Sequence, residues 1–174
     1  MNIQEAIAFI KPGVTLNGLP QHWADLGCGS GTFTSALAQL LPRESTIVAV
    51  DSAPQQLDSK MGNHVSVLFQ QADFEKDKLY LQGLDGILMA NSFHYIQNKE
   101  LLIKHLEKSF KQEKKFLMIE YETQLSNPWV PFPIPFTKLK DLFSRLDYPS
   151  VKKMNERQSA YGGKMYTAVI SKLL

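Results

Sequence analysis

Three glycines that alternate with other residues, Gly27, Gly29 and Gly31, constrain the fold of this chain more than any other feature. They follow a short apolar run at residues 22–24. Apolar residues then recur at helical spacing: Phe33, Ala36, Leu37, Leu40 and Leu41. This order predicts a strand, a glycine turn and a helix. Because glycine lacks a Cβ and tolerates positive φ, the turn predicts a small-molecule site on the main chain at the start of that helix.

Two kinds of ligand bind at such a turn, and the residues around it favour one of them. The dinucleotide fingerprint G-x-G-x-x-G needs its third glycine where this chain has Thr32. Asp25, two positions before the first glycine, would repel the phosphates of a dinucleotide. The turn is therefore better suited to a cationic ligand without phosphate.

At these positions the chain resembles the class I S-adenosylmethionine-dependent methyltransferases, in the small-molecule branch similar to methyltransferase types 11 and 12. The first motif of that family, D-x-G-x-G-x-G, is matched by Asp25, Gly27, Gly29 and Gly31, with Cys28 inside the turn. The resemblance implies S-adenosylmethionine as the cofactor and places these five residues in contact with it.

Two further acids follow predicted strands in the order that this family uses. Residues 45–51 form a β-branched apolar run that ends in Asp51, and Ser52 follows it. The two oxygens of a carboxylate match a ribose diol, so we expect Asp51 and Ser52 to contact the cofactor, although the dinucleotide interpretation predicts the same acid. After the next strand, Asp73 and Phe74 resemble the family's adenine-contacting step. The alternative role for Asp73 is to cap a turn.

A polar and aromatic turn follows the fourth apolar run and includes Asn91, His94 and Tyr95. It should lie at the carboxyl edge of the sheet beside the glycine turn, where Asn91 would contact the cofactor. If the acceptor loses a proton, His94 is the best-placed base because imidazole titrates near neutral pH, and Tyr95 is the second candidate. Glu120 and Tyr121 are weaker candidates. The alternative is that the His94 ring hydrogen-bonds its own loop or packs on the cofactor.

The same turn bears on the choice of acceptor. Relatives that methylate exocyclic amines of nucleobases or a glutamine side chain commonly carry an Asn/Asp-Pro-Pro-Tyr-type segment here. This chain has no proline between Pro54 and Pro128. The resemblance therefore favours a small-molecule acceptor.

The rest of the chain alternates predicted helices and strands, which indicates a single α/β domain over residues 1–174. Strands are expected near 22–26, 46–51, 65–70, 84–90 and 115–121, and helices near 2–10, 31–42, 54–61, 98–111 and 136–146. The runs 150–155 and 164–171, joined through Gly162-Gly163, predict an antiparallel hairpin. The predicted fold is a Rossmann-like, doubly wound, mostly parallel seven-stranded sheet with an antiparallel C-terminal hairpin and helices on both faces.

Segment 126–136 contains four prolines that alternate with large apolar residues. Each proline removes a backbone donor, so the segment is neither a central strand nor a helix interior. It follows the fifth predicted strand and should lie at the carboxyl edge. We expect Trp129, Phe132 and Phe136 to form a stiff apolar wall of the acceptor pocket. The alternative is a loop that packs on the domain's own core or on a partner subunit.

Composition argues against several classes of protein. With 19 basic and 17 acidic residues, the net charge of +2 gives no strong electrostatic footprint for nucleic acid. The single cysteine, Cys28, cannot form an intramolecular disulfide and fits a reducing compartment, and the histidines show no metal-ligand spacing. The chain has no run of about 18 apolar residues and no secretory signal at its start, so we expect a soluble cytoplasmic protein without membrane contact. A homodimer is possible on this sequence.

These features predict an enzyme that transfers a methyl group from S-adenosylmethionine to a small-molecule acceptor by in-line displacement. Two alternatives stay open: a non-catalytic methyltransferase-like partner subunit and a nicotinamide-dependent oxidoreductase. Nucleic-acid methylation ranks behind both. Binding of S-adenosylhomocysteine or of NAD distinguishes these functions.

Overall fold

A mixed sheet forms the centre of the computed structural model, which describes residues 1–15, 17–159 and 162–173. Within these residues the strand order is β3-β4-β2-β1-β5-β6-β8-β7. The strands are β1 (His22–Leu26), β2 (Thr46–Asp51), β3 (Lys60–Met61), β4 (Val65–Gln71), β5 (Gly86–Ala90), β6 (Glu113–Tyr121), β7 (Ser150–Gln158) and β8 (Lys164–Leu173). The helices are α1 (Ile3–Ile10), α2 (Thr32–Leu40), α3 (Lys99–Leu106) and α4 (Phe136–Arg145), with short 3₁₀ turns η1 (Lys11–Gly13), η2 (Phe93–Tyr95) and η3 (Glu107–Ser109).

The sheet confirms the predicted Rossmann-like fold with its antiparallel C-terminal hairpin. Strands β4, β2, β1, β5 and β6 are parallel neighbours, whereas β8 runs antiparallel to β6 and β7 antiparallel to β8. Strands β1 and β2 span the residues predicted for them. Parallel pairing requires crossover connections that cover the sheet, and the central strands β1 and β5 are accordingly almost entirely buried.

One predicted helix, at 54–61, is wrong, and the described sheet accordingly has eight strands rather than seven. Leu57 and Met61 have helical i, i+4 spacing, but tertiary contacts decide their conformation. Met61 pairs antiparallel with Val65 of β4, and Leu57 packs against Gly31 of the glycine turn. Contacts outside the segment therefore override its local periodicity.

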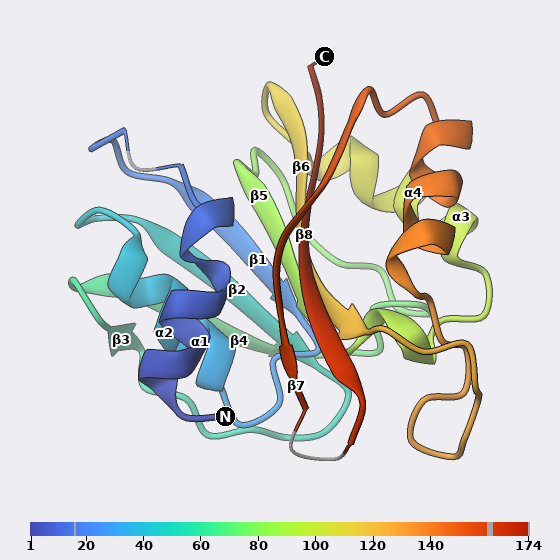
Figure 1. Cartoon of the computed structure of the whole chain (residues 1–174). Helices are drawn as coiled ribbons and strands as arrows, with labels where there is room; N and C mark the ends of the chain where they lie inside the picture. The colour runs from blue at the N-terminus through green and yellow to red at the C-terminus, as the bar shows by residue number, and fades with distance from the viewer. Residues whose placement is uncertain (16, 160–161, 174) are drawn as a thin grey trace.

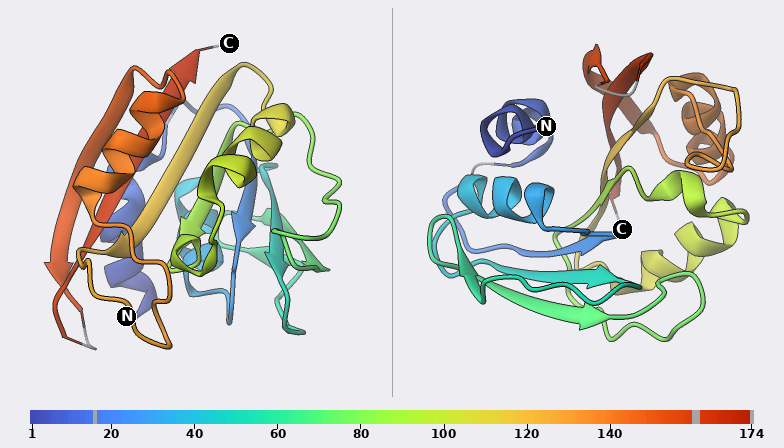
Figure 2. Two further views of the ribbon diagram at one scale, coloured as in Figure 1. Left: turned by 90° about the vertical axis from the view of Figure 1, so that its right-hand side faces the viewer. Right: turned by 90° about the horizontal axis from the view of Figure 1, so that it is seen from below.

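Helices cover both faces of the sheet, as Figures 1 and 2 show. α1 and α2 enclose one apolar cluster with the sheet, and α3 and α4 enclose a second cluster on the opposite face. No helix lies between β4 and β5 in the described chain, and Leu68 of β4 is accordingly 67% exposed. The prediction of a sheet covered on both faces therefore fails locally at β4.

The carboxyl ends of the parallel strands lie at one edge of the sheet, at the bottom of Figure 1. The segment 126–136, coloured orange, leaves the end of β6 and loops at this edge before α4 begins. The glycine turn after β1, the η2 turn after β5 and the end of β6 therefore meet there, as expected for ligand sites in open α/β sheets.

Candidate active site

The glycine turn after β1 depends on two glycines for its packing. Both have positive φ, +80° at Gly27 and +82° at Gly31. A Cβ on Gly27 would lie 2.4 Å from Ser92 Cβ, and one on Gly31 would lie 2.6 Å from Leu57 Cδ2. Gly29 has φ +50° and no described atom within 4 Å of its Cβ position. The turn therefore packs tightly against its neighbours and leaves its main chain open to a ligand at Gly29.

Two buried oxygens at the carboxyl edge have no hydrogen-bond partner. Asp25 is fully buried at the end of β1; its Oδ2 accepts from Thr34 Oγ1 at 2.6 Å, but its Oδ1 has no partner. Asn91, with φ +55° immediately after β5, likewise has an unpartnered Oδ1. They are the only two such buried side-chain atoms in the described residues. Unpaired buried acceptors are costly, so each of these oxygens is suited to accept from an N–H donor of a ligand.

Burial raises the pKa of the Asp25 carboxyl from its ordinary value of 3.8 to about 7. The hydrogen bond from Thr34 opposes this rise, and the nearby negative charge of Asp51 adds to it. A cation bound at Oδ1 would compensate the ionised form and lower the pKa again. A buried carboxyl with a shifted pKa and an unpartnered oxygen makes Asp25 a candidate site residue.

A cavity of about 390 Å³ lies beyond the ends of β2 and β4 and is lined by Asp51, Ser52, Asp73 and Phe74. Asp51 accepts from Gly29 N at 2.8 Å through Oδ2 and from Ala53 N at 2.9 Å through Oδ1. Each carboxylate oxygen has a second lone pair, so Asp51 can also accept hydrogen bonds from a diol.

Asp73 has the turn-capping contacts that were the alternative to a ligand role. It accepts from Glu75 N at 3.0 Å and from Lys76 Nζ at 2.7 Å, and the hydrogen bond from Lys76 lowers the pKa of the Asp73 carboxyl. Because Asp73 also lines the cavity, a cap and a ligand contact are compatible there.

Cys28 lies inside the glycine turn and lines a smaller cavity, of about 240 Å³, together with Asp25 and Gly29. Burial raises the pKa of its thiol to about 12, and the negative charges of Asp25 and Asp51 add to the rise. The thiol is therefore protonated at neutral pH and is not a nucleophile.

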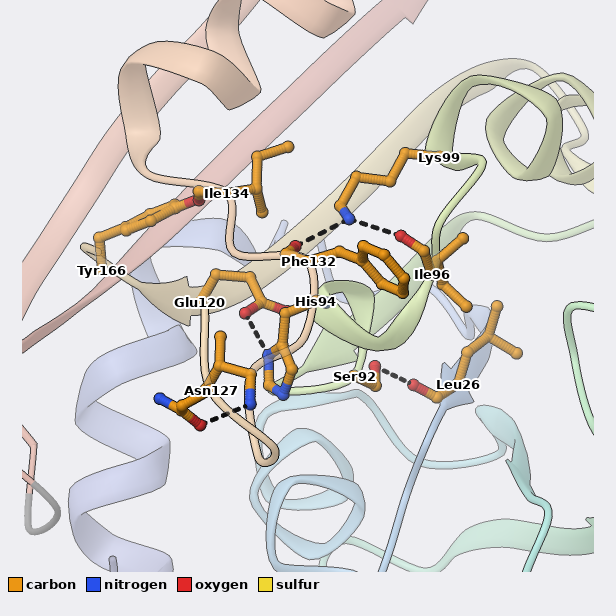
Figure 3. A network of polar contacts seen from close by, with 11 residues as sticks. Leu26, Ser92, His94, Ile96, Lys99, Glu120, Asn127, Phe132, Ile134 and Tyr166 are labelled. Carbon is orange, nitrogen blue, oxygen red and sulfur yellow. Dashed lines mark hydrogen bonds and ion pairs between the residues drawn. The ribbon is translucent and has the colours of Figure 1, made fainter. Parts of the chain in front are cut away.

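His94 of the η2 turn and Glu120 of β6 form a buried polar pair (Figure 3). Their side chains are 2% and 1% exposed, and His94 Nδ1 lies 2.6 Å from Glu120 Oε2. The backbone N–H of His94 donates to the other carboxylate oxygen, Oε1, at 3.1 Å. Glu120 therefore fixes both the ring and the main chain of His94.

A cavity of about 750 Å³ lies beside this pair and extends between the η2 turn, the end of β6 and segment 126–136. Asn91 and Tyr95 line both this cavity and the one beside Asp51, so the two spaces adjoin at these residues. The described lining residues are Asn91, His94, Tyr95, Tyr121, Glu122, Thr123, Leu125, Asn127, Trp129, Val130, Gly162, Gly163 and Lys164.

Segment 126–136 is anchored through the main chain of Phe132 (Figure 3). Phe132 N donates to His94 O at 2.9 Å, and Phe132 O accepts from Lys99 Nζ at 2.9 Å. Lys99 also donates to Ile96 O at 2.6 Å, and burial lowers the pKa of its ammonium to about 8. Lys99 therefore links the η2 turn and segment 126–136.

The structure separates the three aromatic residues predicted to form one wall. Trp129 lines the large cavity and is 78% exposed. Phe132 lines a different groove, beside Lys99, whose Nζ lies 5.6 Å from the centroid of its ring. Phe136 begins α4 and packs edge-on against Tyr166 at 5.7 Å. Of the three, only Trp129 lines the cavity of about 750 Å³.

Two residues of the site carried a sequence signal that the sequence analysis used little or not at all: Glu120 appears there only as a weaker base candidate, and Lys99 does not appear. Glu120 interrupts the apolar run of β6, where an unpaired acid would be costly. Lys99 is the first residue of α3, where the helix dipole disfavours a cation. Ser92 and Thr34, which contact Gly27 and Asp25, carried no signal of this kind.

Two absences hold for the described part of the chain. Within it, no group of three or more His, Cys, Asp or Glu side chains is arranged to hold a metal ion. None of its helices is long and apolar enough to cross a bilayer.

Comparison with known proteins identifies the family to which this chain belongs. A family model described as a methyltransferase domain matches residues 22–171. No curated protein sequence matches the chain.

Solved structures share the fold at low sequence identity. YcgJ of Bacillus subtilis is 12% identical, with a TM-score of 0.71 over 98% of this chain and 99% of that one. The 1,6-didemethyltoxoflavin-N1-methyltransferase of Burkholderia thailandensis, solved with 1,6-didemethyltoxoflavin and S-adenosylhomocysteine, is 15% identical, with a TM-score of 0.71 over 99% and 78%. The citrinin polyketide synthase CMeT domain is 17% identical, with a TM-score of 0.63 over 97% of this chain, which spans about half (51%) of that structure.

Proposed function

The chain belongs to the methyltransferase-domain family as a class I S-adenosylmethionine-dependent enzyme, and from this premise we propose that it methylates a small molecule bound beside His94. The cofactor would lie along the carboxyl edge from Asp25 to Asp73. The acceptor would occupy the 750 Å³ cavity.

The single observation that carries the proposal is the pair of unpartnered oxygens, Asp25 Oδ1 and Asn91 Oδ1. The α-amino group of S-adenosylmethionine is a cation with N–H donors, and an ionised Asp25 with Asn91 offers it two acceptors. Gly29 gives it access to the main chain, while Asp51 and Asp73 offer acceptors to a ribose and an exocyclic amine. The residues therefore fit this cofactor.

The adjoining cavities support methyl transfer between two ligands. S-adenosylmethionine, when bound, supplies an electrophilic methyl group on a sulfonium. Asn91 and Tyr95 line both cavities, so a methyl group presented beside them faces the acceptor cavity. The chain's own contribution is to hold the two reactants in line and to exclude water at this junction.

A small-molecule acceptor is supported by the size and lining of the cavity. Its volume of about 750 Å³ is within the range of small-molecule sites. The name of the Burkholderia thailandensis structure also states that its protein methylates and binds a small molecule.

The nicotinamide alternative conflicts with the position of Asp25. A dinucleotide would bring phosphates to the glycine turn, beside a buried carboxyl that already has one unpaired oxygen. The non-catalytic alternative gives no use for the two unpaired oxygens, which cost stability unless a ligand binds them.

Calorimetric titration tests the proposal. We expect saturable, one-to-one binding of S-adenosylhomocysteine and no binding of NAD at the same concentrations. Transfer of a labelled methyl group to the small-molecule fraction of a cell extract would then identify the acceptor. Absence of binding at millimolar S-adenosylhomocysteine, with the protein folded by circular dichroism, would overturn it.

A further inference from the structure

We propose that Glu120 is a positioning residue that holds His94 as a general base, and that the acceptor is an uncharged molecule with a weakly acidic hydroxyl, a phenol or an enol. This inference rests on the proposed function, since it names the acceptor class of the same cavity. It adds the residue that prepares the base and the proton that the base removes.

Glu120 determines which nitrogen of His94 carries a proton. An ionised carboxylate can only accept hydrogen bonds, so Nδ1, 2.6 Å from Glu120 Oε2, must be the donor. The neutral ring is then the Nδ1–H tautomer, and Nε2 keeps its lone pair. The second carboxylate oxygen accepts from His94 N at 3.1 Å, which fixes the carboxylate relative to the ring.

The second ring nitrogen of His94, Nε2, points away from Glu120 (Figure 3). Among the described residues no hydrogen bond is made by Nε2. His94 lines the cavity of about 750 Å³, and we place Nε2 at that cavity. The rings of Tyr95 and Tyr121, with centroids 4.4 Å and 5.7 Å from that of His94, flank the imidazole and limit its rotation.

The cavity is suited to an uncharged acceptor because its described charged residues are neutralised within the protein. Glu122 accepts from Lys153 Nζ at 2.6 Å and from Phe136 N at 3.0 Å. Lys164 donates to Glu156 at 2.6 Å. A charged acceptor would lose its hydration here without gaining an opposite charge.

A hydroxyl acceptor requires a base of this kind. An amine can attack through its own lone pair, but a phenol or enol is a far better nucleophile without its proton. The acceptor O–H bond breaks and leaves its electron pair on oxygen, while the proton forms an N–H bond at Nε2. The oxygen then bonds to the methyl carbon as the carbon–sulfur bond breaks with its electron pair on sulfur. The imidazolium passes its proton to solvent, and Glu120 stabilises it until then.

Nitrogen-15 NMR of histidine-labelled protein, with and without S-adenosylhomocysteine, tests the tautomer. We expect a protonated Nδ1 and an unprotonated Nε2 for His94 in the wild type, because Nδ1 faces Glu120 Oε2. Glu120→Gln, whose amide can donate to Nδ1, should shift His94 to the Nε2–H tautomer. Glu122→Gln, a neighbouring cavity acid that is bound by Lys153, is the matched control and should leave the tautomer unchanged.

An Nε2–H or doubly protonated His94 in the wild type, or an unchanged tautomer in Glu120→Gln, would overturn the inference. Because the spectra need no bound cofactor, failure to bind S-adenosylhomocysteine would count against the proposed function alone. The product of labelled methyl transfer tests the acceptor class. A methyl ether of an uncharged compound is expected, whereas a methyl ester or an N-methyl product contradicts it.

Discussion

Asp25→Asn should raise the free energy of unfolding and weaken ligand binding at the proposed cofactor site. Burial raises the pKa of Asp25 from 3.8 to about 7, so the folded protein binds this proton more tightly than the unfolded chain. At about 1.4 kcal/mol per pH unit, that difference corresponds to about 4 kcal/mol. The sign follows from linkage: the free energy of unfolding falls as pH rises from about 4 to about 7, and is lowest above that window.

Asp25→Asn removes this charge but keeps an oxygen for Thr34 Oγ1. Its amide places an N–H₂ near the position of the unpaired Oδ1, at a cost of about 1–3 kcal/mol. We therefore expect a net gain of about 1–3 kcal/mol at pH 8, equivalent to about 2–12 °C in Tm. At pH 4 the wild-type carboxyl is neutral in the folded state, so the gain should disappear or reverse.

Urea unfolding of both proteins at pH 4 and pH 8 measures this difference. Asp58→Asn, at an exposed carboxyl, is the control and should change stability little at either pH. A stability difference for Asp25→Asn that is the same at both pH values would refute the reasoning. The same variant should bind S-adenosylhomocysteine about 10- to 100-fold more weakly, because one charged hydrogen bond is lost.

Three other substitutions test separate parts of the site. Gly27→Ala would place a Cβ 2.4 Å from Ser92 Cβ at φ +80°. Calorimetry should therefore show at least about 10-fold weaker S-adenosylhomocysteine binding, and urea unfolding should show a free energy of unfolding lowered by about 1–3 kcal/mol. Lys99→Met removes the donor to Phe132 O, so hydrogen exchange at the Phe132 amide should accelerate, while Lys104→Met should leave it unchanged. Trp129→Ala alters a side chain that is 78% exposed, so Tm and S-adenosylhomocysteine affinity should stay constant while the KM for the acceptor rises; an unchanged KM would contradict a role for Trp129 in the cavity.

The parts of the fold that were predictable depend on local chemistry. The strand, turn and helix around Gly27 follow from apolar spacing and from glycine's freedom at positive φ, and β2 follows from its β-branched run. The predicted helix at 54–61 failed because β4 offers Met61 a strand partner, and no local pattern reports such a partner.

Some residues of the candidate site were likewise predictable from the sequence, and others were not. Asp25, Asp51 and Asn91 lie at or next to the carboxyl ends of parallel strands, so their location at one edge was predictable from topology. The orientations of Phe132 and Phe136 depend on distant hydrogen bonds and on the start of α4, which prolines alone do not specify. The His94–Glu120 pair joins residues of different elements, and only the isolated acid in an apolar strand pointed to it.

A crystal structure with S-adenosylhomocysteine tests the central claim most directly. The account predicts the ligand's amino group within hydrogen-bond distance of Asp25 Oδ1 and Asn91 Oδ1, its ribose at Asp51, and its sulfur facing the cavity beside His94. A ligand bound elsewhere, or crystals soaked at millimolar ligand that leave both oxygens unpaired, would contradict it.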